Sequence, residues 1–269
     1  MAGDRRWIPD DLDTQRPSIA RIYDYALGGG HNLASDRAVF EQLLAIQPNM
    51  REIAWNNRAF MRRAVLFMIE SGIRQFLDLG SGIPTVGNVH EIAQRIEPSC
   101  RVVYVDREDV AVAHSQLLLE CNPLATIVEA DITLPGRVLR HRDTLRLLDF
   151  SQPLGVLALT VGHYVDDDQV LGVFERYRDA LVPGSMLGIS HITDDFERVK
   201  THEMIETAIR AGGDGLHARS HVQIQRLFGD FEMAEPGLVP PSSWRPDSVP
   251  PVTMAPEDDG MWAGVAVKR

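Results

Sequence analysis

Five short, almost wholly apolar runs alternate with amphipathic helical patterns through the middle of this chain. The runs cover residues 75–79, 101–105, 126–130, 154–161 and 185–190. Strands this apolar are buried on both faces, which is the situation of a parallel sheet covered by helices. The strict alternation of strand and helix therefore predicts a doubly wound α/β fold with right-handed crossovers.

The two ends of the chain depart from this alternation. Residues 231–236 and 261–268 have strand patterns, while the stretch 236–256 carries seven prolines and no helical stripe. Strands joined without a crossover helix should pair antiparallel. Near the N-terminus, apolar residues at helical spacing predict a helix over 18–26, a second one capped by Ser35, and a third over 51–71.

We therefore expect a Rossmann-like α/β fold with a seven-stranded, mostly parallel sheet that ends in an antiparallel hairpin. Residues 1–72 should form an N-terminal helical extension, or lid, and residues 73–269 the domain built on the sheet. Further helices are expected over 136–148 and 195–211. The proline-rich stretch should be an ordered loop that contains no helix.

Charge and composition narrow the classes of partner. The 269 residues carry a formal net charge of −11, and an acidic protein has no general attraction for a phosphate backbone, so nucleic acid is not expected as a partner. The first residues are polar, without the apolar stretch of a signal peptide, and no run is long enough to span a bilayer. With two cysteines outside any C-x-x-C motif, these features predict a cytoplasmic protein with no membrane partner.

The strongest functional signal is the segment FLDLGSGIPT, residues 76–85, where the first apolar run ends. In an open α/β sheet the ligand binds in the crevice beyond the carboxyl ends of the strands. Gly80 and Gly82 let the backbone approach a ligand, and Asp78 adds a carboxylate beside them. A dinucleotide site would have a third glycine where Thr85 stands, so a cationic ligand suits this turn better than a pyrophosphate. The alternative is that Asp78 only holds the turn.

Two further acids end the next two runs. Asp106 is placed to accept hydrogen bonds from both hydroxyls of a ribose, although it could instead cap the helix that follows. Asp131 could accept from the exocyclic amine of adenine, with Ile132 covering the ring. The simpler interpretation of Asp131 is a loop or capping residue.

The fourth run ends in TVGHY, residues 160–164, on a loop that should face the same crevice. His163 is a candidate general base or orienting donor because histidine titrates near neutrality. Tyr164 is a candidate to line the reaction channel. The alternative for His163 is a structural histidine that caps the next helix, and His191, after the fifth run, is a weaker candidate of the same kind.

Taken together, FLDLGSG, YVDRE, EADIT and the HY loop resemble the class I S-adenosylmethionine-dependent methyltransferases. Three longer segments, RPSIARIYDYALGGGHNLASDR, GSGIPTVGNVHEIAQ and PGLVPPSSWRPD, are similar to a bacterial family of S-adenosyl methyltransferases that was long grouped as a domain of unknown function. The similarity extends from about residue 8 to residue 269.

The resemblance implies a class I methyltransferase fold with S-adenosyl-L-methionine as the cofactor. It implies that Asp78, Gly80 and Gly82 contact the methionine part, Asp106 the ribose, Asp131 the adenine and Thr160 the methionine amine or backbone. Pro84 stands where many of these enzymes have another glycine.

The segment YDYALGGGHN, residues 23–32, combines aromatic residues, three successive glycines and a His–Asn pair. Such a loop can close over a ligand, and an aromatic face attracts a cationic sulfonium by about 0.5–2 kcal/mol. Either Tyr23 or Tyr25 could present such a face, and we predict that the segment, with Tyr23 and Asn32, forms part of a lid over the cofactor. The alternative is a plain turn between two helices, with tyrosines in the core.

These observations predict a methyltransferase that acts on a small-molecule acceptor, with His163 and Tyr164 as candidate catalytic residues. Three alternatives stay open at this point: a non-catalytic cofactor-binding or regulatory protein, a less favoured NAD-dependent oxidoreductase, and an aminopropyl transfer or other unusual use of the same cofactor. No metal is expected, because His217 and His221 have no third ligand close in sequence. Trp244 and Arg245 should either border the acceptor pocket or pack at the surface.

Overall fold

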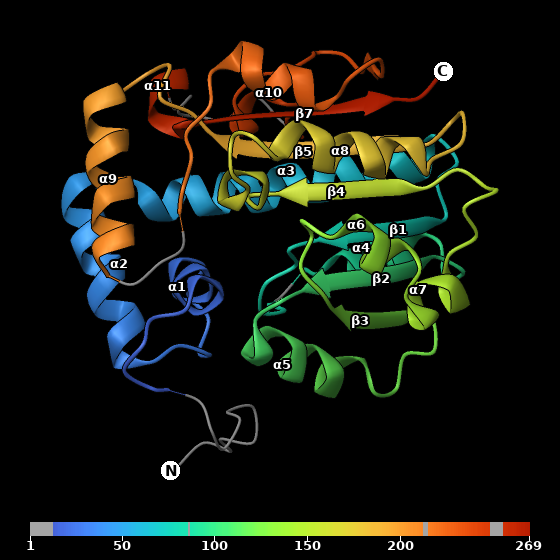
Figure 1. The fold of residues 1–269 in the computed structure, drawn as a ribbon, viewed down its shortest axis with the longest axis horizontal. Helices are drawn as coiled ribbons and strands as arrows, with labels where there is room; N and C mark the ends of the chain where they lie inside the picture. The colour runs from blue at the N-terminus through green and yellow to red at the C-terminus, as the bar shows by residue number, and fades with distance from the viewer. Residues whose placement is uncertain (1–12, 86, 212–214, 248–254) are drawn as a thin grey trace.

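The computed structural model describes residues 13–85, 87–211, 215–247 and 255–269 (Figure 1). The strands are β1 (Gln75–Leu79), β2 (Arg101–Asp106), β3 (Ala125–Glu129), β4 (Gly155–Leu159), β5 (Met186–Ile192), β6 (Glu232–Met233) and β7 (Met261–Val267). The α-helices are α1 (Ile19–Ala26), α2 (Ala34–Ile46), α3 (Met50–Glu70), α4 (Val89–Ile96), α5 (Asp109–Leu119), α6 (Pro135–Leu139), α7 (Arg142–Leu147), α8 (Val170–Asp179), α9 (Arg198–Arg210), α10 (His221–Leu227) and α11 (Pro256–Asp259). Two short 3-10 turns are η1 (Gly162–Tyr164) and η2 (Pro241–Ser243).

The strands form one seven-stranded sheet in the order β3-β2-β1-β4-β5-β7-β6. Strands β1 to β5 run parallel to one another, and β7 is antiparallel to both β5 and β6. This confirms the expected mostly parallel sheet with an antiparallel C-terminal end. The strand order reverses between β1 and β4, which makes this pair the topological switch point where an open α/β sheet binds its ligand.

Helices cover both faces of the sheet, as the apolar strands require. Because side chains alternate along a strand, Phe76 packs with residues of α3, α4 and α5, while Leu77 packs with residues of α6, α7, α8 and α10. The helix α3, which precedes the predicted boundary at residue 72, therefore covers one face of the sheet itself. Among the described residues, no helix is both long enough and apolar enough to cross a membrane.

The helices α1, α2 and α9 form a cap on the side to which the parallel strands point (Figure 1). The cap joins distant parts of the chain, because α2 packs against both α1 and α9. Within it, Arg21 of α1 and Asp36 of α2 form a buried ion pair, with Nε 2.7 Å from Oδ2. Asp36 also accepts a hydrogen bond from the backbone N–H of Leu33, so Asp36, and not the predicted Ser35, caps the start of α2.

Several local predictions are wrong for identifiable reasons. The expected helix over 136–148 is broken into α6 and α7, because the side chain of His141 caps a new helix by accepting from the N–H of Asp143. The helix α10 was not predicted, although Ser220 and Gln223 form the capping box that could have indicated it. Short turns of helix also interrupt the proline-rich stretch: η2 and α11 each have proline in the first turn, where its missing N–H is harmless.

Trp244 lies in the core, which neither of the two alternatives drawn from the sequence anticipated. Its side chain is fully buried and packs edge-on against Phe60 and Phe67 of α3. Arg63 donates from Nε to the carbonyl of Trp244 at 2.7 Å, and the guanidinium of Arg245 lies 3.9 Å from the ring centroid of Phe67. Both residues therefore hold the segment between β6 and β7 against α3.

Replacing Trp244 with alanine should lower the free energy of unfolding by about 3–5 kcal/mol, because it leaves a cavity in a packed aromatic cluster. The matched control is Trp55→Ala, since Trp55 is 55% exposed on the same helix that Trp244 contacts, and its effect should stay within about 0.5 kcal/mol. Urea denaturation followed by circular dichroism measures both changes. Equal effects of the two substitutions would contradict a core role for Trp244.

Candidate functional site

A cavity of about 320 Å³ opens at the carboxyl ends of the parallel strands. The ends of β1, β2, β3 and β4 form one wall, and residues of α1, α2, α3 and α9 form the other. It therefore lies at the switch point between β1 and β4, where the topology predicts a ligand. Its volume is within the range of small-molecule sites.

The turn after β1 brings backbone to the cavity. Gly80 and Gly82 have positive φ angles of 68° and 64°, a region that favours glycine. A Cβ on Gly80 would lie 2.2 Å from Cγ2 of Val161, so a side chain there would push the β1 and β4 turns apart. A Cβ on Gly82 would have no atom of the described residues within 4 Å. The turn therefore offers a ligand both accessible backbone and open space.

Asp78 borders the cavity at the end of β1 and is 7% exposed. Burial raises the pKa of its carboxyl to about 7, with Arg58 opposing the rise and Asp106 adding to it. A carboxylate that is costly to ionise gains most from a cationic partner. The structure thus supports the predicted preference of this turn for a cationic group.

Arg58 of α3 lies in the wall beside this turn and was not singled out from the sequence. It donates from Nη2 to Oγ1 of Thr85 at 2.8 Å and to Oδ1 of Asn88 at 3.0 Å. Its Nε is buried without a partner in the described part of the chain. Arg58 and Asp78 thus place a cation and an acid at one end of the cavity. The sequence held no signal for this, because α3 contains other arginines at similar spacing, namely Arg51, Arg62 and Arg63.

Asp106 ends β2 and borders the cavity with 8% of its surface exposed. Its Oδ2 accepts from the N–H of Gly82 at 2.7 Å, and its Oδ1 accepts from the N–H of Glu108 at 3.0 Å. The carboxylate therefore braces the β1 turn against the loop after β2. The position of Asp106 is therefore compatible both with the predicted ligand contact and with the alternative capping role.

Glu108 links the cap to the sheet at the same edge and was not predicted. It borders the cavity, and its carboxylate accepts a hydrogen bond from the hydroxyl of Ser18, the N-cap residue of α1. A carboxylate at a helix N-terminus is stabilised by the helix dipole. Glu108 thus fixes the start of α1 next to Asp106.

The end of β3 places Asp131 and Ile132 in the cavity wall, as predicted. Oδ1 of Asp131 accepts from the N–H and the hydroxyl of Thr133, at 2.8 and 2.7 Å. Its Oδ2 lies 3.4 Å from Nη1 of Arg107. Asp131 therefore also orders its own loop, and Ile132, 8% exposed, adds an apolar surface beside it.

Thr160 borders the cavity at the end of β4 with a φ of 53°, an unusual conformation for a residue other than glycine. Its N–H donates to the carbonyl of Ser190 at 3.0 Å, and its hydroxyl donates to the carbonyl of Leu159 at 2.7 Å. These bonds to β4 and β5 hold the strained residue in place. Such strain concentrates at functional sites.

His163 and Tyr164 both border the cavity, on η1. His163 is 6% exposed, and its Nδ1 has no hydrogen-bond partner among the described residues. Burial lowers the pKa of His163 well below its ordinary value, and His191 and Arg219 lower it further. The ring is therefore neutral at physiological pH and is a weak base.

His191, the weaker candidate, has a structural role. It is fully buried, with Nδ1 2.8 Å from the carbonyl of Ile192 and Nε2 2.9 Å from Nη1 of Arg219. Arg219 in turn donates to the carbonyls of Gly162 and Val165, at 2.9 and 2.6 Å. His191 and Arg219 therefore hold the loop that carries His163. Arg219, 28 positions further along the chain, was not predicted.

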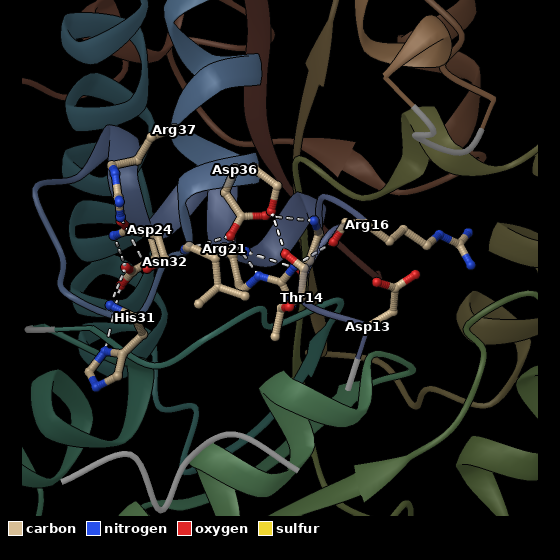
Figure 2. Close-up of polar contacts among 12 residues, drawn as sticks. Asp13, Thr14, Arg16, Arg21, Asp24, His31, Asn32, Asp36 and Arg37 are labelled. Atoms are coloured by element: carbon tan, nitrogen blue, oxygen red, sulfur yellow. Dashed lines mark hydrogen bonds and ion pairs between the residues drawn. The ribbon is translucent and has the colours of Figure 1, made fainter. Parts of the chain in front are cut away.

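The glycine-rich segment after α1 is organised by Asp24 (Figure 2). Oδ2 of Asp24 accepts from the backbone N–H of His31 at 2.8 Å and from Nδ2 of Asn32 at 3.1 Å. Asn32 also donates to the carbonyl of Gly29 at 2.8 Å, and a Cβ on Gly29 would lie 2.0 Å from Oδ1 of Asp24. Asn32 thus bonds within its own loop and is not among the described residues that border the cavity.

Tyr23, in contrast, does border the cavity. Its hydroxyl accepts from Nδ2 of Asn57 at 2.9 Å, and Asn57 is 3% exposed in the same wall. The Oδ1 of Asn57 is buried without a partner in the part of the chain that is described. The two predicted lid residues therefore have different positions. Tyr23 borders the cavity, whereas Asn32 stabilises the loop between α1 and α2.

The described residues contain no group of three or more His, Cys, Asp or Glu side chains arranged to hold a metal ion. The two histidines considered from the sequence have other contacts. Nε2 of His217 lies 3.1 Å from Oδ1 of Asp166, and Nε2 of His221 lies 3.1 Å from the carbonyl of Leu238.

Comparison with known proteins is consistent with this architecture. The family model for S-adenosyl methyltransferases matches residues 5–269. A presumed methyltransferase from Thermobifida fusca YX is 40% identical, with a TM-score of 0.92 over 98% of this chain and 99% of its own. A DUF574 family protein from Streptomyces avermitilis MA-4680 is 33% identical, with a TM-score of 0.91 over 96% of this chain and 99% of its own. No curated protein has a significantly similar sequence.

The family match and the two structural relatives cover nearly the whole chain, so the resemblance read from the sequence is confirmed and the oxidoreductase alternative is excluded. The chain belongs to the S-adenosyl methyltransferase family, and it is a methyltransferase that uses S-adenosylmethionine.

Proposed function

We propose that this methyltransferase acts on a small-molecule acceptor, which binds in the cavity between the cap helices and the loop after β4. The observation that supports this is the continuity of one cavity from the ends of β1, β2, β3 and β4 to α2 and α9. Cofactor and acceptor can therefore meet in one enclosed site. The net charge of −11 is a further argument against a nucleic-acid acceptor.

The residues at one end of the cavity fit the amino-acid part of S-adenosylmethionine. Buried Asp78 would accept from the ammonium group, and Arg58, whose buried Nε has no partner among the described residues, would donate to the carboxylate. Gly80 and Gly82 would contact the same part through their backbone, with open space beside Gly82. Thr160 would lie next to it, at the end of β4.

The next two strand ends fit the nucleoside. Asp106 borders the cavity and would accept from the ribose hydroxyls, in addition to the backbone N–H groups that it already binds. Asp131 would accept from the adenine amine, and Ile132 would cover the ring. Tyr23 lies across the cavity and would contribute an aromatic surface from the cap.

Bound S-adenosylmethionine supplies a methyl group on a sulfonium, which needs no further activation. The protein's task is therefore to orient the acceptor, an effect worth on the order of 7–11 kcal/mol. His163 would position the acceptor by a hydrogen bond and would not serve as a strong base, because its ring is neutral with a depressed pKa. Tyr164 would line the channel beside it.

The cap would act as a lid that excludes water during the transfer. We propose that α1 and α2 supply most of it, and that α9 completes it, because α9 packs against α2 and borders the cavity. We also propose a cytoplasmic location, which the two free cysteines support.

The proposed division of the cofactor site can be tested with two ligands. S-adenosylhomocysteine has the amino-acid part, and 5′-methylthioadenosine lacks it. Asp78→Asn and Arg58→Met should each weaken the first ligand by about 10–100-fold, from a lost charged hydrogen bond of about 1.5–3 kcal/mol, and change the second by less than about twofold. Asp106→Asn should weaken both ligands alike. Isothermal titration calorimetry gives the affinities of the three variants and of the unaltered protein for both ligands.

The control for this experiment is Arg62→Met, since Arg62 is half exposed on α3 and pairs with Asp247 at the surface. It should bind both ligands as the unaltered protein does. If Asp78→Asn and Arg58→Met weakened the truncated ligand as much as the complete one, the assignment of these residues to the amino-acid part would be wrong. If neither ligand bound the unaltered protein, the proposed site itself would be wrong.

Cofactor affinity should depend on pH through Asp78. Its pKa is about 7 in the ligand-free protein, and the ligand ammonium binds the ionised form, so affinity for S-adenosylhomocysteine should fall by about tenfold per pH unit below pH 7. Proton release on binding at pH 6.5, measured by calorimetry in buffers of different ionisation enthalpy, should vanish in Asp78→Asn. A flat pH profile would contradict the contact.

The same titration has a consequence for stability. Because the pKa is raised in the folded protein from 3.8, the unfolded state ionises first as pH rises. The contribution of Asp78 to stability is therefore complete below pH 3.8 and is lost between about pH 4 and pH 7. The ligand-free Asp78→Asn protein should lack this loss in denaturation curves recorded across that range, and an unchanged loss would assign it to another group.

A further inference from the structure

We propose that the methyl acceptor is a neutral, largely apolar molecule that carries a hydroxyl or N–H donor at its reacting end. The inference rests on the proposed function, because it assigns the acceptor to the cavity that also holds the cofactor. Three features of the wall carry it: its apolar surface, the pairing of its charged groups, and a buried polar atom without a partner.

The cap side of the cavity is largely apolar along two helices, and the hydroxyl of the polar residue Thr201 on α9 already donates to the carbonyl of Thr193. Val39, Phe40 and Leu43 border it from α2, and Met204 and Ala208 border it from α9. The three α2 residues are buried, and Phe40 is fully so. A polar molecule placed against this surface would lose its hydration without replacement, whereas an apolar one would gain by burial.

On the cap side of the cavity, the charged side chains either have partners or lie at the edge of the cavity. Asp259 is fully buried and accepts from the N–H and hydroxyl of Ser242 and from Nδ2 of Asn56. Glu197 is more than half exposed and pairs with Lys200. Among the described residues that border the cavity, the arginines are Arg58 and Arg107, which lie beside the β1 turn and the β3 end. An anionic acceptor would therefore meet no cation against the cap.

Asn57 of α3 adds a buried polar side chain to the wall of the cavity. Its Nδ2 is held by the hydroxyl of Tyr23, which fixes the amide, and its buried Oδ1 has no partner among the described residues. Unpartnered buried acceptors are rare in native proteins, and Asn57 borders the cavity. A donor on the acceptor molecule would satisfy this oxygen and turn the reacting end toward the cofactor.

Three matched probes separate these requirements. With the protein saturated by S-adenosylhomocysteine, 2-naphthol should bind, 2-methoxynaphthalene should bind at least about tenfold more weakly because it leaves Oδ1 of Asn57 unpaired, and 2-naphthyl phosphate should not bind. Isothermal titration calorimetry gives the three affinities. Preference for the phosphate, or equal affinity for naphthol and its methyl ether, would overturn the proposal.

Substitutions of residues in the cavity wall test whether these affinities depend on that wall. In Asn57→Leu the difference between naphthol and its methyl ether should disappear, which a merely apolar pocket would not predict. Met204→Lys should weaken naphthol by at least about tenfold, whereas Glu203→Lys, the adjacent exposed position on α9, should not. If Met204→Lys fails to fold, Ala208→Phe should block naphthol by filling the same space.

The outcomes distinguish this proposal from the proposed function. If the unaltered protein does not bind S-adenosylhomocysteine, both the proposed cofactor site and this inference are refuted. Normal binding of S-adenosylhomocysteine, with the phosphate probe preferred or naphthol excluded, would refute only the class of acceptor.

Discussion

The whole site depends on a sheet that is buried on both faces. Its five parallel strands have no polar face on which to carry chemistry, so polar side chains are confined to the strand ends. Parallel strands end at the same edge, and the reversal of order between β1 and β4 opens a gap there. Asp78, Asp106, Asp131 and Thr160 therefore meet in one cavity although they span 82 positions of sequence, from 78 to 160.

An edge of this kind is open to water until a cap is added, and the cap is held by polar contacts that are themselves buried. Arg21 and Asp36 join α1 to α2, and Glu108 binds the N-cap of α1. Breaking one partner of a buried pair typically costs about 3–5 kcal/mol, because the other charge is left uncompensated. These contacts therefore hold the start of α1 beside Asp106. The third helix of the cap, α9, comes from a distant part of the chain and packs against α2.

The sequence was sufficient for features that depend on local periodicity. The strand runs, the Gly80 turn and the acid at Asp106 lie where strand and turn patterns predict them. Features that depend on how one element lies across another were not predictable. Nothing local distinguishes Arg58 from Arg62 on α3, yet the first faces the site and the second faces solvent. The same limit applied to Asn32, whose side chain binds the buried carboxylate of Asp24 and does not border the cavity among the described residues.

The neutral state of His163 limits the chemistry that the site can perform. A histidine held by burial well below its ordinary pKa gains little from taking a proton, so it cannot drive deprotonation of a poorly acidic acceptor. Methyl transfer from a sulfonium does not require a strong base when the nucleophile already carries a lone pair and is aligned. For an amine acceptor an apolar cavity favours the same outcome, because it keeps the amine uncharged, with its lone pair free to attack the methyl group. On the proposed function, the depressed pKa of His163 and the apolar cap both favour a reaction in which orientation of the acceptor, and not base catalysis, accelerates methyl transfer.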